Sequence, residues 1–174
     1  MHMRRRILIL CLAFTLLFSG CQLPSASKAQ KLLPLSFRAT VDMQVQKETY
    51  RAVCTFLDAE SVSIAFQKPE NLETFTVTQT KTDCQIDFLG LHQEAQEPCL
   101  QKESFLHQIF LAYVALQDEN QYVIKRGKEV SYYIGKMPEA FQFTWTKDNK
   151  TNEMIALSIP QAKLECTFSG VTML

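Results

Sequence analysis

The sequence predicts an α+β domain that is mainly antiparallel β, with one central helix, and two patterns carry this prediction. Between residues 37 and 168, apolar and polar residues alternate in short segments, as in strands with one buried and one exposed face. Residues 109–116, near the middle of that region, are instead continuously apolar. The connections between the alternating segments are short, which favours an antiparallel meander on each side of the apolar run.

About ten strands are expected, five before the apolar run and five after it. The clearest segment is residues 37–45, in which Phe37, Ala39 and Val41 alternate with polar residues. Pro69 ends the third segment, because proline cannot donate to a strand ladder. Residues 92–99 are expected to be a polar break. The expected strands cover residues 37–45, 50–56, 62–66, 75–77, 84–88, 122–124, 130–134, 141–145, 155–159 and 164–168.

The apolar run is expected to be a helix over about residues 103–117. This stretch contains neither glycine nor proline, which favours a helix. A helix that is apolar nearly all round should be buried on more than one side. Glu103, His107 and Gln108 are expected on its thin polar edge. A fully buried strand is the alternative, because periodicity separates the two poorly in short apolar runs.

The start of the chain resembles a bacterial lipoprotein signal. Arg4–Arg6 precede a twelve-residue apolar run, Ile7–Phe18, which is shorter than the roughly 20 residues of a membrane span. Ser19, Gly20 and Cys21 then match a lipobox, although Phe18 stands where leucine is usual. The resemblance implies a signal peptide over residues 1–20, a diacylated Cys21 and anchoring to the outer face of the bacterial cell membrane, or to the outer membrane where one exists. A plain secretory signal or a short anchor helix is the alternative.

The rest of the chain is then a tether, residues 21–35, and one domain, residues 36–174. The tether contains prolines and serines and is expected to be flexible. The chain has 18 basic and 18 acidic residues, and removing Arg4–Arg6 with the signal leaves 15 against 18. We find no basic stripe that would indicate binding to nucleic acid or to anionic lipid.

Four cysteines remain besides Cys11 and Cys21, and an extracytoplasmic location would permit disulfides. Cys54, Cys84 and Cys166 share a face with the apolar residues of their strands, so we expect burial whatever their redox state. They either remain free or form one bridge. If a bridge forms, Cys84 and Cys99 are the expected pair, because they flank the same strand-to-helix connection.

Catalytic and metal-binding patterns are scarce, so no enzyme activity, cofactor or metal is expected. The sequence has no Gly-x-Ser-x-Gly, phosphate-binding glycine loop or His-Glu-x-x-His. Ser25–Lys28 matches Ser-x-x-Lys but lies in the tether. His92, Glu94 and Glu97 could hold a cation, but a solvated polar loop explains them better.

The element order resembles that of the lipoprotein-localisation carriers, the LolA/LolB-like family. The similar segments are Phe37–Val41, Ile64–Leu72, Phe143–Trp145, Leu157–Pro160 and Cys166–Ser169. The resemblance implies a curved half-barrel with the apolar helix packed in or over its concave face.

The resemblance also implies a non-catalytic protein that holds an acyl chain, a lipid or a lipoprotein in the half-barrel. The alternative is an envelope adaptor that binds another protein, such as a cell-wall enzyme, through a sheet edge. In that case the apolar interior is only core. The expected ligand-binding residues are Phe37, Ala39, Val41, Ile64, Phe66, Phe110, Tyr113, Val114, Phe143 and Trp145.

Overall fold

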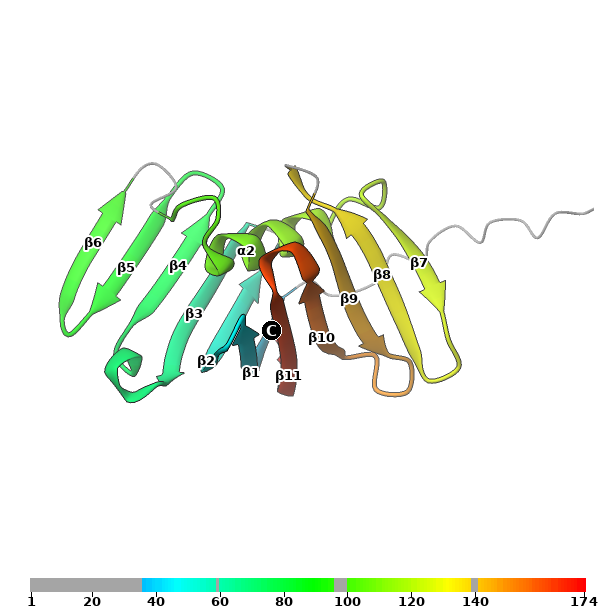
Figure 1. Ribbon diagram of the computed structural model, residues 1–174, viewed down its shortest axis with the longest axis horizontal. Helices are drawn as coiled ribbons and strands as arrows, with labels where there is room; N and C mark the ends of the chain where they lie inside the picture. The colour runs from blue at the N-terminus through cyan, green and yellow to red at the C-terminus, as the bar shows by residue number, and fades with distance from the viewer. Residues whose placement is uncertain (1–35, 59, 96–99, 139–140) are drawn as a thin grey trace, which may run out of the picture. The chain divides into compact units, whose positions relative to one another are not determined.

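One antiparallel sheet dominates the computed structural model, which describes residues 36–58, 60–95, 100–138 and 141–174 (Figure 1). The helix α2, Phe105–Ala115, lies between the two halves of the sheet in the sequence. Two short 3-10 helices, η1 (Glu70–Leu72) and η3 (Pro160–Ala162), form connections. The strands are β1 (Phe37–Val45), β2 (Glu48–Leu57), β3 (Ser61–Lys68), β4 (Thr76–Thr80), β5 (Cys84–Phe88), β6 (Leu91–Ala95), β7 (Tyr122–Arg126), β8 (Val130–Lys136), β9 (Gln142–Asp148), β10 (Met154–Ile159) and β11 (Leu164–Met173).

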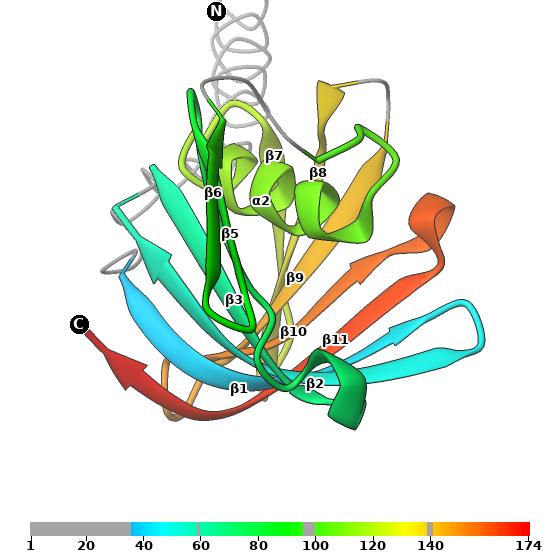
Figure 2. The same ribbon diagram turned by 90° about the vertical axis from the view of Figure 1, so that its left-hand side faces the viewer.

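The strand order explains why the helix must cross the sheet. The order is β6-β5-β4-β3-β2-β1-β11-β10-β9-β8-β7, so the first and last strands of the domain pair at the centre and join the two meanders. The chain between β6 and β7 therefore connects the two opposite edges. Figure 2 shows α2 on the concave side, with β1, β2 and β11 below it and the outer strands rising beside it. The predicted open half-barrel with a helix over its concave face is confirmed.

Alternating burial follows the alternating sequence. In β1, Phe37, Ala39, Val41 and Met43 are buried, and the residues between them are exposed or half-buried. The same alternation continues in β2, β3, β9 and β11. Period-two strands with one apolar face pack that face against a core and leave the other in water. The peptide bond between Lys68 and Pro69 is cis.

The central apolar run is the helix expected, and the buried-strand alternative is wrong. Ser104 is the residue before its first turn, and Leu116 closes it through backbone bonds to the preceding turn. Among the described residues, no helix is long and apolar enough to cross a membrane. One detail was predicted incorrectly: Gln108 is buried instead of lying on a polar edge. Its amide Nε2 donates to the backbone oxygen of Lys102 at 2.6 Å, which makes this burial tolerable.

The expected polar break after residue 91 begins with a strand. β6 pairs with β5 and its residues are exposed or half-exposed. Because it is an edge strand with water on both faces, it needs no apolar alternation, and the sequence pattern could not reveal it. The sheet therefore has eleven strands, one more than expected, and His92 lies in a strand instead of a loop.

Candidate ligand-binding face

The residues expected to bind a ligand form one packed core between the sheet and the helix. Nine of the ten are buried, and Val114 is half-buried. The structure therefore places these residues in the core of the domain, and their role in binding a ligand stays a prediction. The buried nine are Phe37, Ala39, Val41, Ile64, Phe66, Phe110, Tyr113, Phe143 and Trp145.

Phe56, on β2, links the rings of this core. Its ring centroid lies 4.5 Å from that of Phe37 and 5.0 Å from that of Tyr113 on the helix. Trp145 lies 6.0 Å away in an edge-to-face arrangement. These are the separations at which aromatic pairs attract each other. The region beneath the middle of the helix is thus occupied by side chains.

A hydrogen bond fixes the helix to the sheet above this core. The indole Nε1 of Trp145, which is fully buried, donates to the backbone oxygen of Ala112 at 3.0 Å. The same oxygen accepts the N–H of Leu116 at 3.2 Å. A buried indole N–H requires a partner, so the position of α2 satisfies a polar group of the sheet.

Polar side chains at the first half of the helix connect it to β4. The side chains of Gln79 and His107 meet at 2.7 Å between Nε2 and Nδ1. Both Gln79 and Gln108 are buried, and their Oε1 atoms have no hydrogen-bond partner among the described residues. Rotating the Gln79 amide would exchange an unpaired oxygen for an unpaired nitrogen, so neither orientation satisfies this group fully. Gln79 could not be identified from the sequence, because a single polar residue in a strand gives no pattern.

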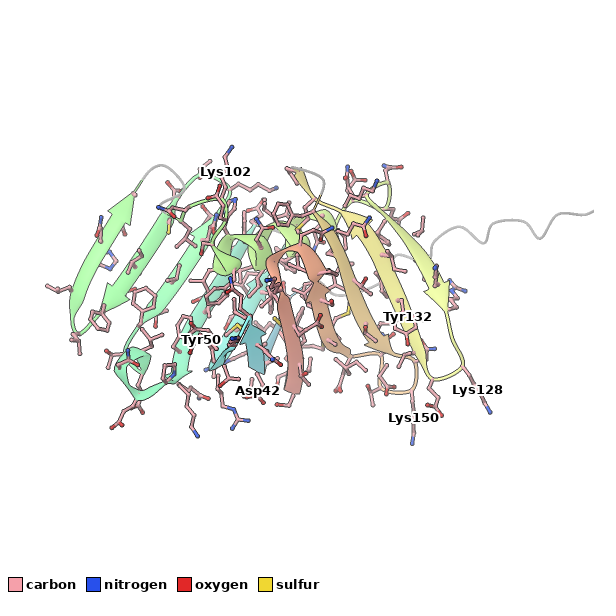
Figure 3. All side chains as sticks on the ribbon, in the orientation of Figure 1. Asp42, Tyr50, Lys102, Lys128, Tyr132 and Lys150 are labelled. Atoms are coloured by element: carbon pink, nitrogen blue, oxygen red, sulfur yellow. The ribbon has the colours of Figure 1, made fainter. Side chains whose placement is uncertain are left out.

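Five aromatic rings form a continuous line from the helix toward the β6 edge, and we call this line the aromatic row. Phe105 stacks on Tyr50 at 5.2 Å, and Tyr50 contacts Phe66 at 5.9 Å. Phe75 lies 5.8 Å from Phe66, and Phe88 lies 5.8 Å from Phe75. Tyr50 lies on β2 (Figure 3). The rings of the row lie on the concave face, because the strand register places them on the same face as buried residues such as Val77.

The aromatic row differs from the central core in its exposure. Phe66 is buried, but the other four rings are half-buried. Beyond Phe88, Leu91 is 74% exposed and faces Phe88 across the β5–β6 pair, while Leu89 in the hairpin turn is 69% exposed. Exposed large apolar side chains that continue a half-buried apolar surface are typical of interaction sites. The sequence could not reveal this row, because its rings meet only through the strand register.

His92 lies on the opposite, outer face of the same hairpin. Its Nδ1 lies 2.6 Å from Asp87 Oδ1 and its Nε2 lies 3.1 Å from Glu94 Oε1. Hydrogen bonds to these two carboxylates raise the pKa of His92 above its ordinary value. The expected alternative of a solvated surface group fits this arrangement. Within the described residues, no group of three or more metal-binding side chains is placed to hold a cation.

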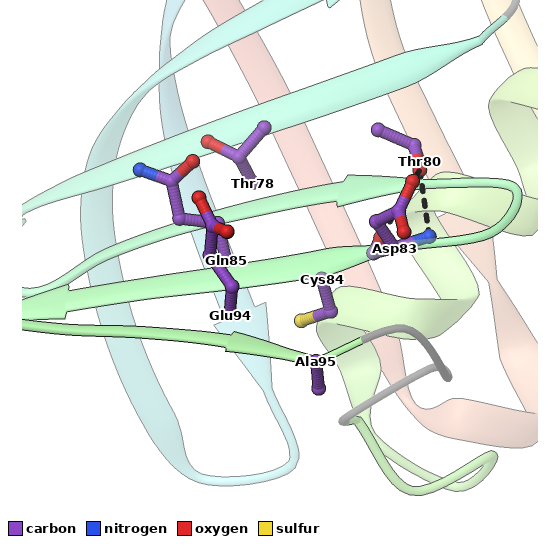
Figure 4. A pocket seen from close by; sticks show the side chains of 7 residues that line it. All are labelled: Thr78, Thr80, Asp83, Cys84, Gln85, Glu94 and Ala95. Atoms are coloured by element: carbon purple, nitrogen blue, oxygen red, sulfur yellow. Dashed lines mark hydrogen bonds between the residues drawn. The ribbon is translucent and has the colours of Figure 1, made fainter.

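A polar pocket of about 510 Å³ lies along β4, β5 and β6 (Figure 4). Its walls include Thr78, Gln85 and Glu94. At its end, Thr80 Oγ1 accepts the backbone N–H of Asp83 at 2.8 Å. Thr80 and Asp83 thus satisfy each other at this end of the pocket. Five of the seven lining residues are polar, which suits an acyl chain poorly.

The buried cysteines behave as expected from their strand faces. Cys54 and Cys166 are buried free thiols, and burial raises the pKa of Cys54 to about 12. Burial likewise raises the pKa of Cys166. Cys84 is buried and disulfide-bonded, and its partner lies outside the described residues. Cys99 also lies outside them, as do Cys21, the signal peptide and the tether, so the pairing and the anchor stay predictions.

Comparison with known proteins gives similarity in structure alone. No protein-family model and no curated protein matches the sequence. An uncharacterised conserved protein from Thermus thermophilus aligns with a TM-score of 0.48 and 11% identity, over 80% of this chain and 78% of its own.

Two further solved structures align over a similar length. A LolA superfamily protein from Nitrosomonas europaea gives a TM-score of 0.43 and 8% identity, over 83% of this chain and 89% of its own. A DUF1329 family protein from Desulfovibrio piger gives 0.37 and 9%, over 79% and 85%. Each alignment therefore spans most of both chains at very low sequence identity.

Proposed function

We propose that this protein is a non-catalytic envelope protein that binds a hydrophobic ligand, such as an acyl chain, along the aromatic row. One observation carries the proposal: four of the five rings are half-buried, and the row continues into the exposed Leu91. Ligand sites are mostly apolar and lined by aromatic side chains. A chain lying along these rings would bury apolar area that is otherwise in contact with water.

The ligand lies beside the helix in this proposal, which departs from the expectation of a cavity beneath it. Phe56, Tyr113 and Trp145 are fully buried and fill the region under α2. A ligand there would have to break the bond between Trp145 Nε1 and Ala112 and separate packed rings. Binding along the aromatic row requires neither change.

Binding of a fluorescent fatty acid to the full-length protein tests the proposal. Replacing Phe88 by serine should weaken binding about five- to tenfold, because one ring contact of about 1 kcal/mol and its buried area are lost. Leu91→Ser is the milder variant: Leu91 is 74% exposed, so the fold should be unaffected. Tyr132→Ser is the matched control, since Tyr132 is an exposed aromatic residue of β8 on the outer face, and it should bind as the wild type does. Equal binding by Leu91→Ser, Phe88→Ser and the wild type would refute the row as the site.

The emission of Trp145 shows which side of the helix the ligand occupies. Trp145 is the single tryptophan of the sequence and donates to the helix backbone. If the ligand lies on the aromatic row, the emission maximum should not move on binding. A shift to longer wavelength would mean that α2 has left Trp145, and the ligand would then belong beneath the helix.

We also propose that lipid on Cys21 anchors the protein outside the cell. The basic segment, the short apolar run and Ser19–Cys21 support this. Two acyl chains are needed, because one holds a protein only marginally at a membrane. Replacing Cys21 by alanine should abolish incorporation of labelled palmitate, and unchanged incorporation would reject the anchor.

A second function, that of an adaptor, is favoured by the free edge of β6. Within the described part of the chain, β6 pairs with β5 alone, and Leu91 and Leu89 flank its start. An extended segment of another envelope protein could add a strand there. The adaptor is favoured by a partner that co-purifies with the wild type and is lost with Glu94→Pro, whose N–H points to the free edge of β6. The partner should be retained with Ile124→Pro, the matching change on the other edge strand, β7. The same result together with no fatty-acid binding would replace the first proposal.

A further inference from the structure

Two cationic side chains lie in one row across the other arm of the sheet, formed by β7, β8 and β9. The register pairs Arg126 with Ser131, and Ser131 with Lys147. Lys147 lies two residues after Trp145 and therefore on the same concave face of β9. Directly opposed residues on neighbouring strands have Cβ atoms about 5 Å apart. The two long cations thus flank the short side chain of Ser131, and we call these three residues the cationic row.

Lys147 is buried, and no described residue gives it a charged partner of opposite sign. It is 5% exposed, and its Nζ donates to the neutral Oδ1 of Asn152 at 2.6 Å. Burial, together with repulsion from Arg126, lowers the pKa of Lys147. Among the described residues, neither cation forms an ion pair with a carboxylate. Residues 1–35 contain no aspartate or glutamate, so that segment cannot supply one. A buried ammonium without a counter-charge is energetically unfavourable.

The acidic residue next in sequence is held elsewhere. Asp148 follows Lys147 and points to the other face of the strand, as alternation requires. Its Oδ1 accepts the backbone N–H groups of Lys150 at 2.6 Å and Thr151 at 2.9 Å. This carboxylate is therefore used to build the turn between β9 and β10 and does not pair with Lys147.

The surroundings of the cationic row are fixed by hydrogen bonds between two turns. Ser131 Oγ donates to Asn149 Oδ1 at 2.6 Å, and Asn149 Nδ2 donates to the backbone oxygen of Gly127 at 3.0 Å. These bonds tie the β9–β10 turn to the β7–β8 hairpin. The lysines at the two turn tips, Lys128 and Lys150, extend away from the sheet (Figure 3). The backbone around the row and the side chain of Ser131 are therefore held in place before any ligand arrives.

We propose that Arg126 and Lys147 bind a phosphate group over Ser131. Two cations from different strands suit a phosphate, which carries more charge than a carboxylate and offers oxygen atoms in several directions. The phosphate can be a free ion or a lipid headgroup. The headgroup is compatible with the next residues along β7, Ile124 and Tyr122, because both are half-buried and share the concave face. This site is separate from the aromatic row, so either can fail without the other.

Titration of the full-length protein with inorganic phosphate and with octyl phosphate, each followed by calorimetry, tests the site. Binding of both with similar affinity identifies a free phosphate site, and much tighter binding of octyl phosphate identifies a lipid headgroup. Octyl glucoside, which has the chain without the charge, should not compete. If neither phosphate compound binds, the proposal is overturned.

Replacing Lys147 by methionine, which keeps the length of the side chain, separates binding from structure. Affinity for the phosphate probe should fall about tenfold or more, as for loss of one charge-assisted hydrogen bond. The melting temperature should stay level or rise, because an unpaired buried charge is removed. If Lys147 instead stabilises the fold through its bond to Asn152, the Lys147→Met variant should have a lower melting temperature than the wild type.

Arg126→Gln and Lys150→Met complete the comparison. Arg126 is exposed, so its replacement should weaken phosphate binding several-fold with no change in melting temperature. Lys150 is an exposed lysine of the neighbouring turn, and its variant should bind as the wild type does. Undiminished phosphate affinity in both Arg126→Gln and Lys147→Met would overturn the site. A loss of affinity in Lys150→Met equal to that in the other two variants would also overturn it, because it would indicate attraction by net charge alone.

Discussion

Removing the indole of Trp145 tests whether the helix is fixed to the sheet as the structure shows. In Trp145→Phe the bond from Nε1 to the Ala112 oxygen is lost, and a net contribution of about 1 kcal/mol goes with it. The Ala112 oxygen keeps its bond from Leu116, so no unpaired carbonyl adds to this cost. The smaller ring leaves roughly 40 Å³ unfilled at about 24 cal/mol per Å³, which adds about 1 kcal/mol. We expect a loss of about 2 kcal/mol in the free energy of unfolding.

Urea denaturation followed by far-ultraviolet circular dichroism measures this loss without needing the tryptophan. Phe143→Leu is the matched control, because Phe143 is fully buried on the same strand face and has no polar atom to lose. It should cost about 1 kcal/mol from ring volume alone. If Trp145→Phe costs no more than Phe143→Leu, the indole bond does not hold the helix, and the argument that α2 remains in place during binding fails.

Three further predictions concern single groups of the domain. Burial raises the pKa of Cys54 to about 12, so its thiol should not react with an aromatic disulfide reagent at pH 8 until the protein unfolds. Burial also raises the pKa of Cys166, which should behave in the same way. Fast labelling of either thiol in the native state would contradict its burial. Gly135→Ala should strongly destabilise the domain, because a Cβ there would overlap the Phe143 ring and lie 2.5 Å from the backbone oxygen of Gln121. A melting temperature near that of the wild type would rule out this close packing. The carboxylates of Asp87 and Glu94 raise the pKa of His92 in the folded protein. The ion pair of His92 with these carboxylates should therefore stabilise the β5–β6 hairpin fully below the unfolded pKa of about 6.5. This stabilisation should be lost as the pH rises through the folded pKa. A nuclear magnetic resonance titration should show that pKa falling in Asp87→Asn, and an unchanged value excludes the pair.

The strands that pack a core could be predicted from the sequence, because burial imposes a pattern there. Residues 37–45 alternate in the sequence and in exposure. The helix could also be predicted, since eight consecutive apolar residues do not fit a one-faced strand. β6 could not be predicted, because an edge strand that is exposed on both faces does not require alternating apolar and polar residues. The same limit explains the prediction of a polar break.

The candidate sites depend on register, which a single sequence does not contain. Phe75 and Phe88 are separated by a turn in the chain and meet because β4 and β5 pair. Arg126 and Lys147 are 21 positions apart and share a row through β8. Lys147 closes a strand whose other inward residues are aromatic, and a lysine at a strand end looks like an ordinary turn residue until its burial is known.

The balance of energies favours the arms of the sheet over the space beneath the helix for the proposed ligand. Phe56, Tyr113 and Trp145 are fully buried beneath α2. If moving the helix uncovered half of each ring, on the order of 100 Å² apiece, the cost would be about 2–3 kcal/mol per ring. Three rings give about 6–9 kcal/mol, which is the order of the whole stability of a domain, about 5–15 kcal/mol. The apolar contacts of a ligand beneath the helix would only replace the contacts that these three rings lose. Half-buried rings on the aromatic row offer the same kind of contact without moving the helix, so the proposed acyl chain would gain more there.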